Sequence, residues 1–293
     1  MVAHVARLIL AVVLVLAGAC APGRAVADGS SRHTLAIAGL ERDYRLYTPV
    51  GVQAPAPLVV MLHGGFGSAE QAERTYGWNA LADREGFVVA YPDGVGRAWN
   101  AGGCCGRPAR DGVDDVGFVG AVVDDVAARL PVDRRRVFAA GMSNGGMMAY
   151  ALACGSDVFA AIGPVAATQV SDCGSPRPTA VVAIHGEADQ SVRADGAPGA
   201  GIARVDGPPV ADVDAFWRRV DACDAPVVDV APPVTTSAAD CAEGRGVTLI
   251  SVAGAGHQWP GSQPVREGAD PPSGAVDATQ TLWAFFAAHP AAG

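Results

Sequence analysis

Lysine is absent from this chain of 293 residues, so arginine supplies all of its permanently charged basic side chains. We interpret the missing lysine as a bias of genome composition. The 21 arginines are outnumbered by 30 aspartates and glutamates, which gives a net charge of −9. No basic stripe runs along the sequence, so we do not expect nucleic acid or an anionic membrane face as a partner.

Repeats and charged blocks are also lacking. No period of about 20 to 50 residues recurs, no heptad pattern persists, and the longest block of like charge is Arg134-Arg135-Arg136. These absences exclude solenoids, coiled coils and charged tails. Half of the residues are hydrophobic, which is enough to bury one large core, and α/β chains of this length are commonly single domains. We therefore expect one domain over residues 28–293.

Residues 1–27 read as an export signal. Arg7 supplies a positive start, Leu8 to Leu16 form an apolar run too short to span a membrane, and small residues follow. Two processing sites compete: 16–20 resembles a lipobox ending at Cys20, and 25–27 fits an A-x-A cleavage site after Ala27. We favour a lipid anchor on Cys20 at the cell surface, with secretion after cleavage at Ala27 as the alternative.

No C-x-x-C pair occurs, and no histidine lies close in sequence to a cysteine, so a zinc site is not expected. Either processing route leaves an even set of cysteines, which suits disulfides in an oxidising compartment. Cys223 is expected to pair with Cys241 across a short, turn-rich excursion, and Cys104 or Cys105 to pair with Cys154. Six cysteines allow 15 connectivities, so other pairings stay open. The set is Cys104, Cys105, Cys154, Cys173, Cys223 and Cys241.

Short apolar segments alternate with helical patterns along the chain, after a hairpin of strands at 34–37 and 44–47. Pro57 to Leu62 is a continuous apolar run that ends in His63-Gly64-Gly65, which is typical of a buried parallel strand opening into a functional loop. Further strands are expected at 87–91, 136–140, 160–165, 180–184 and 247–252, helical segments around 69–84, and helices at 114–130, 213–220 and 278–288. This alternation predicts an α/β fold with a doubly wound, mainly parallel sheet and helices on both faces.

Ser143 stands at the centre of a Gly-x-Ser-x-Gly pentapeptide, Gly141 to Gly145. A β-prone run precedes it and helix formers follow it, so the pentapeptide falls on a strand-to-helix turn. The two glycines lack side chains that would clash in such a turn, which leaves the serine hydroxyl exposed above a sheet. An ordinary turn with an incidental serine would show the same five residues, so the surrounding sequence has to decide.

A serine hydroxyl is a weak nucleophile, which needs a base within hydrogen-bond reach and a third group to orient that base. His257 follows the strand ending at Val252, and Asp189 follows the strand ending at Ile184. Both loops therefore lie at the sheet edge that carries Ser143. The chain order Ser143, Asp189, His257 is that of α/β-hydrolases. Glu187 could replace Asp189 as the orienting acid if the loop register differed by two residues.

An oxyanion hole needs backbone N–H groups aimed at the developing charge on the substrate oxygen. Asn144 supplies the first candidate donor. We expect the second from the loop after Leu62, where Gly65 is preferred to Phe66 because a glycine backbone approaches a substrate closely. Phe66, Trp99 and Trp259 are candidates for contact with substrate, although each indole could equally pack its own loop.

Asp114 and Asp115 form a pair of adjacent carboxylates. Such pairs can serve glycosidases, but aspartate at the start of a helix also caps free N–H groups and suits the helix dipole. We therefore interpret the pair as a helix cap.

The chain resembles the polyhydroxybutyrate depolymerase and feruloyl esterase family of α/β-hydrolases, near its exported lipoprotein esterases. The motifs that carry the resemblance span most of the mature chain: 62–65, 78–83 with 87–92, 104–106, 114–118, 141–145, 185–189 and 256–261. The resemblance implies triad roles for Ser143, Asp189 and His257, and esters of hydroxyacids, ferulate or acetylated sugars as substrates.

Two features depart from the family pattern. Many secreted polyester depolymerases carry a linker and a binding module, whereas this sequence ends soon after the helix expected at 278–288, so we do not expect firm binding to an insoluble polymer. Gln258 stands where relatives often have threonine, which bears on the shape of the pocket near Trp259.

The sequence therefore predicts an exported serine esterase that is monomeric, needs no metal or cofactor, and forms an acyl-enzyme at Ser143. A cell-envelope acyltransferase of the same fold would use the same residues with a sugar or lipid hydroxyl in place of water. A non-catalytic surface binding protein that kept the fold is the alternative from another class.

Overall fold

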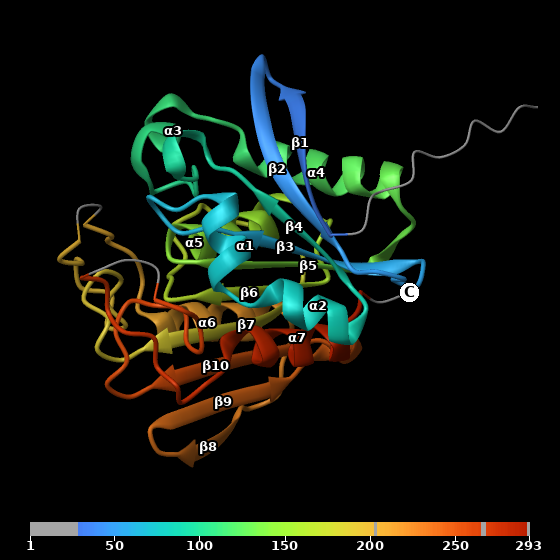
Figure 1. Cartoon of the computed structure of the whole chain (residues 1–293). Helices are drawn as coiled ribbons and strands as arrows, with labels where there is room; N and C mark the ends of the chain where they lie inside the picture. The colour runs from blue at the N-terminus through green and yellow to red at the C-terminus, as the bar shows by residue number, and fades with distance from the viewer. Residues whose placement is uncertain (1–28, 202–203, 265–267, 292–293) are drawn as a thin grey trace, which may run out of the picture.

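The computed structural model describes residues 29–201, 204–264 and 268–291, and the expected signal region with Cys20 lies outside them. One ten-stranded sheet has the order β1-β2-β4-β3-β5-β6-β7-β10-β9-β8. In the sheet, the neighbouring strands β4, β3, β5, β6, β7 and β10 pair in parallel. The antiparallel hairpins β1–β2 and β8–β9 flank them at the two ends (Figure 1). The strands are β1 Gly29–Ile37, β2 Leu40–Thr48, β3 Ala56–Leu62, β4 Val88–Pro92, β5 Val132–Met142, β6 Ala161–Val165, β7 Ala180–Gly186, β8 Val227–Ala231, β9 Val234–Asp240 and β10 Gly246–Val252.

Helices cover both faces of the sheet (Figure 1). They are α1 Ala69–Thr75, α2 Trp78–Glu85, α3 Gly106–Asp111, α4 Asp115–Arg129, α5 Asn144–Gly155, α6 Val210–Val220 and α7 Ala278–Ala288, with short 3-10 turns at Val95–Arg97 and Ala242–Gly244. None of the described helices is long and apolar enough to cross a membrane.

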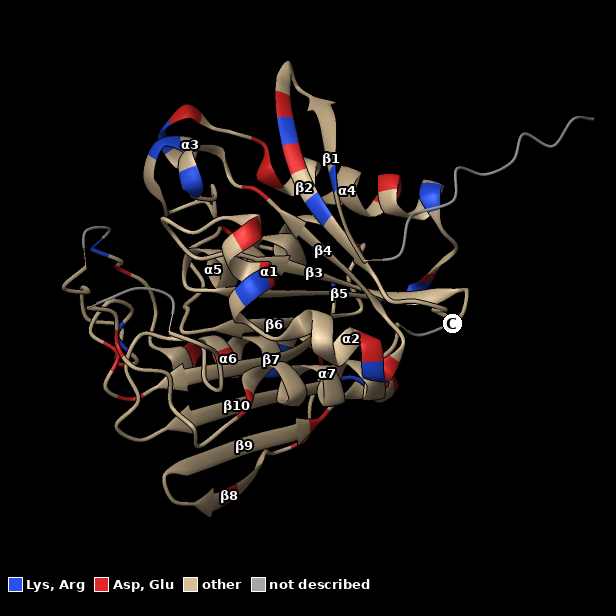
Figure 2. Ribbon diagram, in the orientation of Figure 1, with Lys and Arg blue, Asp and Glu red and all other residues tan. Residues whose placement is uncertain are grey.

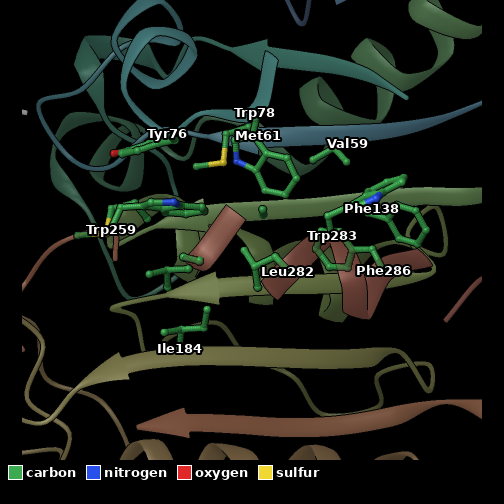
Figure 3. Packing of buried hydrophobic residues seen from close by; sticks show 14 of the residues in the cluster. Val59, Met61, Tyr76, Trp78, Phe138, Ile184, Trp259, Leu282, Trp283 and Phe286 are labelled. Carbon is green, nitrogen blue, oxygen red and sulfur yellow. The ribbon is translucent and has the colours of Figure 1, made fainter. Parts of the chain in front are cut away.

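Side chains of β3 alternate between two cores, as successive residues of a strand must. Val59 and Met61 pack with α1, α2 and α7, and Figure 3 shows this core with Trp78, Leu282 and Phe286. The other β3 side chains, Leu58, Val60 and Leu62, pack with α4, α5 and α6. All seven residues of β3 are buried, which agrees with the continuous apolar run in the sequence. In contrast to β3, the strand β2 and helices such as α1, α2 and α3 carry charged residues (Figure 2).

The helical segments expected around 69–84 are the two helices α1 and α2, which are separated at Gly77 by its left-handed φ of 79°. Two other elements differ from the sequence-based expectations. The excursion between Cys223 and Cys241 is the β8–β9 hairpin, which extends the sheet at its edge. The segment Gly106–Asp111 forms α3, a short helix that no periodic pattern in the sequence predicted.

The disulfides only partly follow the prediction. Cys223 is bonded to Cys241, as expected, but Cys104 is bonded to its neighbour Cys105, and Cys154 to Cys173. The expected bond from the 104–105 loop to Cys154 is therefore wrong. Cys154 lies at the end of α5, where Cys173 approaches to a Cα–Cα distance of 5.1 Å, within the usual range for a disulfide. Backbone hydrogen bonds, such as the one from Gly103 N–H to the Val170 carbonyl (3.0 Å), attach the 104–105 loop instead.

Candidate active site

Ser143 occupies the turn between β5 and α5. Its φ of 55° and ψ of −119° are strained for a residue with a side chain, and its N–H donates to the Val165 carbonyl at 2.8 Å. A Cβ at Gly141 would collide with the Gly145 backbone, and one at Gly145 with the carbonyls of Leu62 and His63. The pentapeptide therefore needs glycine at both ends, as the sequence motif predicted.

Ser143, His257 and Asp189 form one chain of hydrogen bonds, although they are far apart in sequence. The distance from Ser143 Oγ to His257 Nε2 is 2.8 Å, and from His257 Nδ1 to Asp189 Oδ2 it is 2.7 Å. These partners assign the tautomer: Nδ1–H donates to the carboxylate, and Nε2 accepts from the serine hydroxyl. The chain can thus pass the serine proton to the imidazole while the carboxylate orients the ring.

Asp189 is fixed by its own loop. The backbone N–H groups of Ser191 and Val192 donate to its Oδ1 at 2.8 and 2.9 Å, and its side chain is fully buried. Glu187, the alternative acid, is exposed, and only its backbone joins the site, through a 3.0 Å bond from its N–H to the Val252 carbonyl. The structure therefore brings Asp189, and not Glu187, to His257.

The loop after β3 lies beside the serine. A Cβ at Gly64 would be 3.6 Å from Ser143 Cβ, and one at Gly65 would be 3.9 Å from Asn144 Cβ. Phe66 N–H already donates to the Arg97 carbonyl at 2.8 Å, whereas no hydrogen bond within the described residues engages Gly65 N–H. Asn144 is the first residue of α5, so its N–H has no partner within the helix. Gly65 and Asn144 thus remain the candidate donors to a substrate oxygen.

Trp99 and Trp259 are buried, which favours the alternative that each indole packs its own loop. Trp99 is 0% exposed, and its indole N–H donates to the His63 carbonyl at 2.8 Å. Trp259 is 2% exposed, stacks on Tyr76 and donates to the Thr279 hydroxyl at 3.0 Å (Figure 3). Both indoles pack their loops against the core. Phe66, in contrast, is 57% exposed beside Gly65 and remains a candidate for contact with substrate.

Trp99 contributes to the site through its backbone. Its N–H donates to the Asn144 side-chain oxygen at 2.7 Å, and its carbonyl accepts from the Asn144 amide at 3.0 Å. This pair of buried bonds holds the 95–105 loop against the start of α5. The sequence did not predict these two bonds, because the identity of residue 144 does not indicate which distant backbone groups its side chain contacts.

Two further histidines at strand ends are structural. His63 donates from Nδ1 to the Gly64 carbonyl (2.8 Å) and accepts at Nε2 from Gly94 N–H (3.0 Å), and His185 bonds the Val192 carbonyl (2.8 Å). Burial lowers the pKa of both imidazoles, because the charged form loses hydration. They therefore stay neutral and support the loops that carry Gly65 and Asp189.

The Asp114–Asp115 pair does not form a carboxylate site. Asp114 caps α4 by accepting from Gly117 N–H at 2.8 Å, as interpreted from the sequence. Asp115 is buried, accepts from Arg42 (2.6 Å) and from Asn100 N–H (2.7 Å), and thus ties β2 and the loop after Trp99 to α4. Across the described part of the chain, no three His, Cys, Asp or Glu side chains are grouped to hold a metal ion.

Comparisons with known proteins find relatives of this chain among esterases. A family model described as Esterase PHB depolymerase matches residues 42–190. The chain is 37% identical over 265 residues to "Putative esterase NocK" of Nocardia uniformis subsp. tsuyamanensis, covering 81% of this chain and 76% of that protein. It is 30% identical over 220 residues to Feruloyl esterase B of Piromyces equi, covering 69% of this chain but only 39% of that protein.

Among solved structures, an acetyl xylan esterase from Aspergillus awamori superposes with a TM-score of 0.62 at 16% identity, covering 88% of this chain and 99% of that one. At this identity the likeness shows a shared fold. It confirms the α/β-hydrolase fold expected from the sequence.

Proposed function

This chain belongs to the PHB depolymerase family of esterases, and from that membership we propose that it cleaves carboxylic esters through Ser143, His257 and Asp189. The family and the relatives establish the coarser statement, an esterase acting on carboxylic esters. The assignment of the three residues is our proposal. The observation that carries it is the unbroken chain of hydrogen bonds from Asp189 through His257 to the hydroxyl of Ser143.

The proposed reaction has two steps. His257 Nε2 takes the hydroxyl proton as Ser143 Oγ bonds to the ester carbonyl carbon, and Gly65 and Asn144 N–H groups bind the oxyanion. The bond to the alkoxy oxygen then breaks, and His257 returns the proton to the departing alcohol. In the second step water attacks the acyl-enzyme by the same route, which releases the acid and restores Ser143.

For substrates we propose feruloyl or acetyl esters of polysaccharides. Hydroxyalkanoate esters are the alternative substrate class. Relatives named feruloyl esterase and acetylxylan esterase support this proposal. Phe66 supports it too, because an exposed aromatic ring beside the oxyanion donors can pack against an aromatic acyl group or a sugar. The described disulfides and the sequence of residues 1–27 support export, and a lipid on Cys20 remains part of the proposal.

The experiment compares hydrolysis of p-nitrophenyl esters of increasing acyl length and of methyl ferulate by wild type and Ser143→Ala. We expect hydrolysis by wild type, with a preference for short acyl groups or ferulate, and loss of about 10⁶-fold in kcat for Ser143→Ala. A sugar alcohol added to the assay distinguishes hydrolase from acyltransferase. Transfer to the alcohol in excess of free acid would overturn the hydrolase assignment, and activity retained by Ser143→Ala would overturn the nucleophile.

A further inference from the structure

His257 depends on a loop that has no regular secondary structure. The segment from Ala253 to Pro260 follows β10, yet the imidazole has to keep two hydrogen bonds at once, to Asp189 and to Ser143. One side of this loop is held by the acid loop, because Ala188 N–H donates to the Ala255 carbonyl at 2.9 Å. The bond from Glu187 N–H to the Val252 carbonyl continues this contact.

Asp270 holds the other side of the loop. Its carboxylate oxygen Oδ2 accepts from the backbone N–H of His257 at 2.5 Å. The same carboxylate lies against Gly256, where an added Cβ would overlap it. A side chain at position 256 would therefore displace the Asp270 carboxylate, which is a reason for glycine that the sequence motif alone does not show. Asp270 lies 13 residues after His257, outside every motif of the sequence.

We propose that Asp270 is a positioning residue for His257, and this proposal rests on the function proposed for the triad. A peptide N–H held by a side-chain acceptor restricts the backbone torsions of His257 and thus the direction of its ring. A displacement of about 1 Å at a catalytic group can cost about 10²-fold in rate. Asp189 orients the ring through Nδ1, and Asp270 orients the residue through its main chain.

The test compares Asp270→Ala and Asp270→Asn with a matched control, Asp124→Asn. Asp124 is an exposed aspartate on α4 that also accepts a hydrogen bond, from Arg134 at 2.9 Å, and has no contact with the triad. We expect kcat for a p-nitrophenyl ester to fall about 10- to 100-fold in Asp270→Ala with KM within about 2-fold of wild type. Asp270→Asn keeps an acceptor oxygen and is expected to stay within about 3-fold of wild type, and Asp124→Asn to be unchanged.

A second measurement does not depend on turnover. The far-downfield imidazole N–H resonance of the His257–Asp189 hydrogen bond, assigned with His257→Gln, is expected to weaken or disappear in Asp270→Ala and to persist in Ser143→Ala. If Asp270→Ala keeps both the resonance and wild-type kcat, the proposal is overturned. It is also overturned if a folded Asp270→Asn is as impaired as Asp270→Ala. A wild type without esterase activity whose resonance still depends on Asp270 would overturn the proposed function and leave the positioning role standing.

Discussion

Asn144 has two separate tasks in this site. Its peptide N–H, at the first position of α5, is the proposed donor to the substrate oxygen, and its side chain makes two buried bonds to the Trp99 backbone. The main-chain group belongs to the proposed chemistry, and the side chain belongs to the support of the site. A substitution at Asn144 can therefore separate the two.

Asn144→Ala keeps the peptide donor and leaves the N–H of Trp99 without a partner, whereas the Trp99 carbonyl keeps its bond from Cys105 N–H at 3.0 Å. A buried group left unpaired costs about 1–3 kcal/mol, so we expect the free energy of unfolding to fall by about 1–3 kcal/mol, measured by chemical denaturation. We expect kcat/KM to fall by only about 10-fold, because the peptide N–H remains. A loss beyond about 10³-fold in a folded variant would show that the side chain itself binds the oxyanion, against this account.

At this scale the sequence predicted the positions of the candidate triad but not the directions of side chains. The strand-end positions and order of Ser143, Asp189 and His257 are enough to place them at one sheet edge. Trp99 and Trp259 also lie near that edge in sequence, yet both indoles turn into the core, where they bury a large apolar area. Asp270 was missed because a hydrogen bond to a backbone N–H leaves no pattern in the sequence.

At the scale of elements, β2 and α4 are joined by a buried ion pair. Arg42 lies over the Phe118 ring and donates to Asp115, and both charged side chains are at most 4% exposed. Burial raises the pKa of Asp115, while Asn100 N–H and Arg42 act against that rise. The pair therefore connects the antiparallel edge of the sheet to the loop that begins at Trp99.

Arg42→Met leaves the Asp115 carboxylate buried without its cation. Breaking a buried pair from one side typically costs about 3–5 kcal/mol, so we expect a loss of that size in the free energy of unfolding. Arg74→Met serves as the control, because it removes an exposed ion pair with Glu70 and should cost less than about 1 kcal/mol. Equal losses in the two variants would contradict the role given to Arg42.

Elements with a clear helical pattern or a continuous apolar run were predictable from the sequence. The α7 helix was expected at the residues where it occurs, and β3, β6, β7 and β10 within a few residues. The β8–β9 hairpin and the disulfide partners were not, because edge pairing and cysteine proximity depend on how distant segments pack. The helices on both faces of the sheet were expected from the alternation of strands and helices, and the continuous apolar run of β3 contributes side chains to the core on each face.

At the scale of the whole molecule, the absence of lysine simplifies the dependence of stability on alkaline pH, because no lysine side chain titrates there. All five tyrosines have a raised pKa, mainly because burial disfavours the phenolate, and for Tyr47 and Tyr76 it rises to about 12. The unfolded chain would ionise its tyrosines near pH 10, whereas the folded chain keeps them neutral. The folded state therefore binds more protons than the unfolded state above this pH, and stability falls as pH rises.

We expect the free energy of unfolding to decrease above about pH 10, by up to about 1.4 kcal/mol per pH unit for each fully buried tyrosine. Tyrosinate absorbance and circular dichroism, followed together during an alkaline titration, should change in a single shared transition. Tyrosine ionisation near pH 10 with native circular dichroism retained would contradict this prediction.

The central claim is that Ser143 is a nucleophile activated by His257, and labelling with a fluorophosphonate followed by mass spectrometry tests it most directly. We predict one adduct per chain on the peptide that contains Ser143, no adduct in Ser143→Ala, and much slower labelling in His257→Gln. Labelling at another residue, or labelling of wild type and His257→Gln at equal rates, would contradict the account.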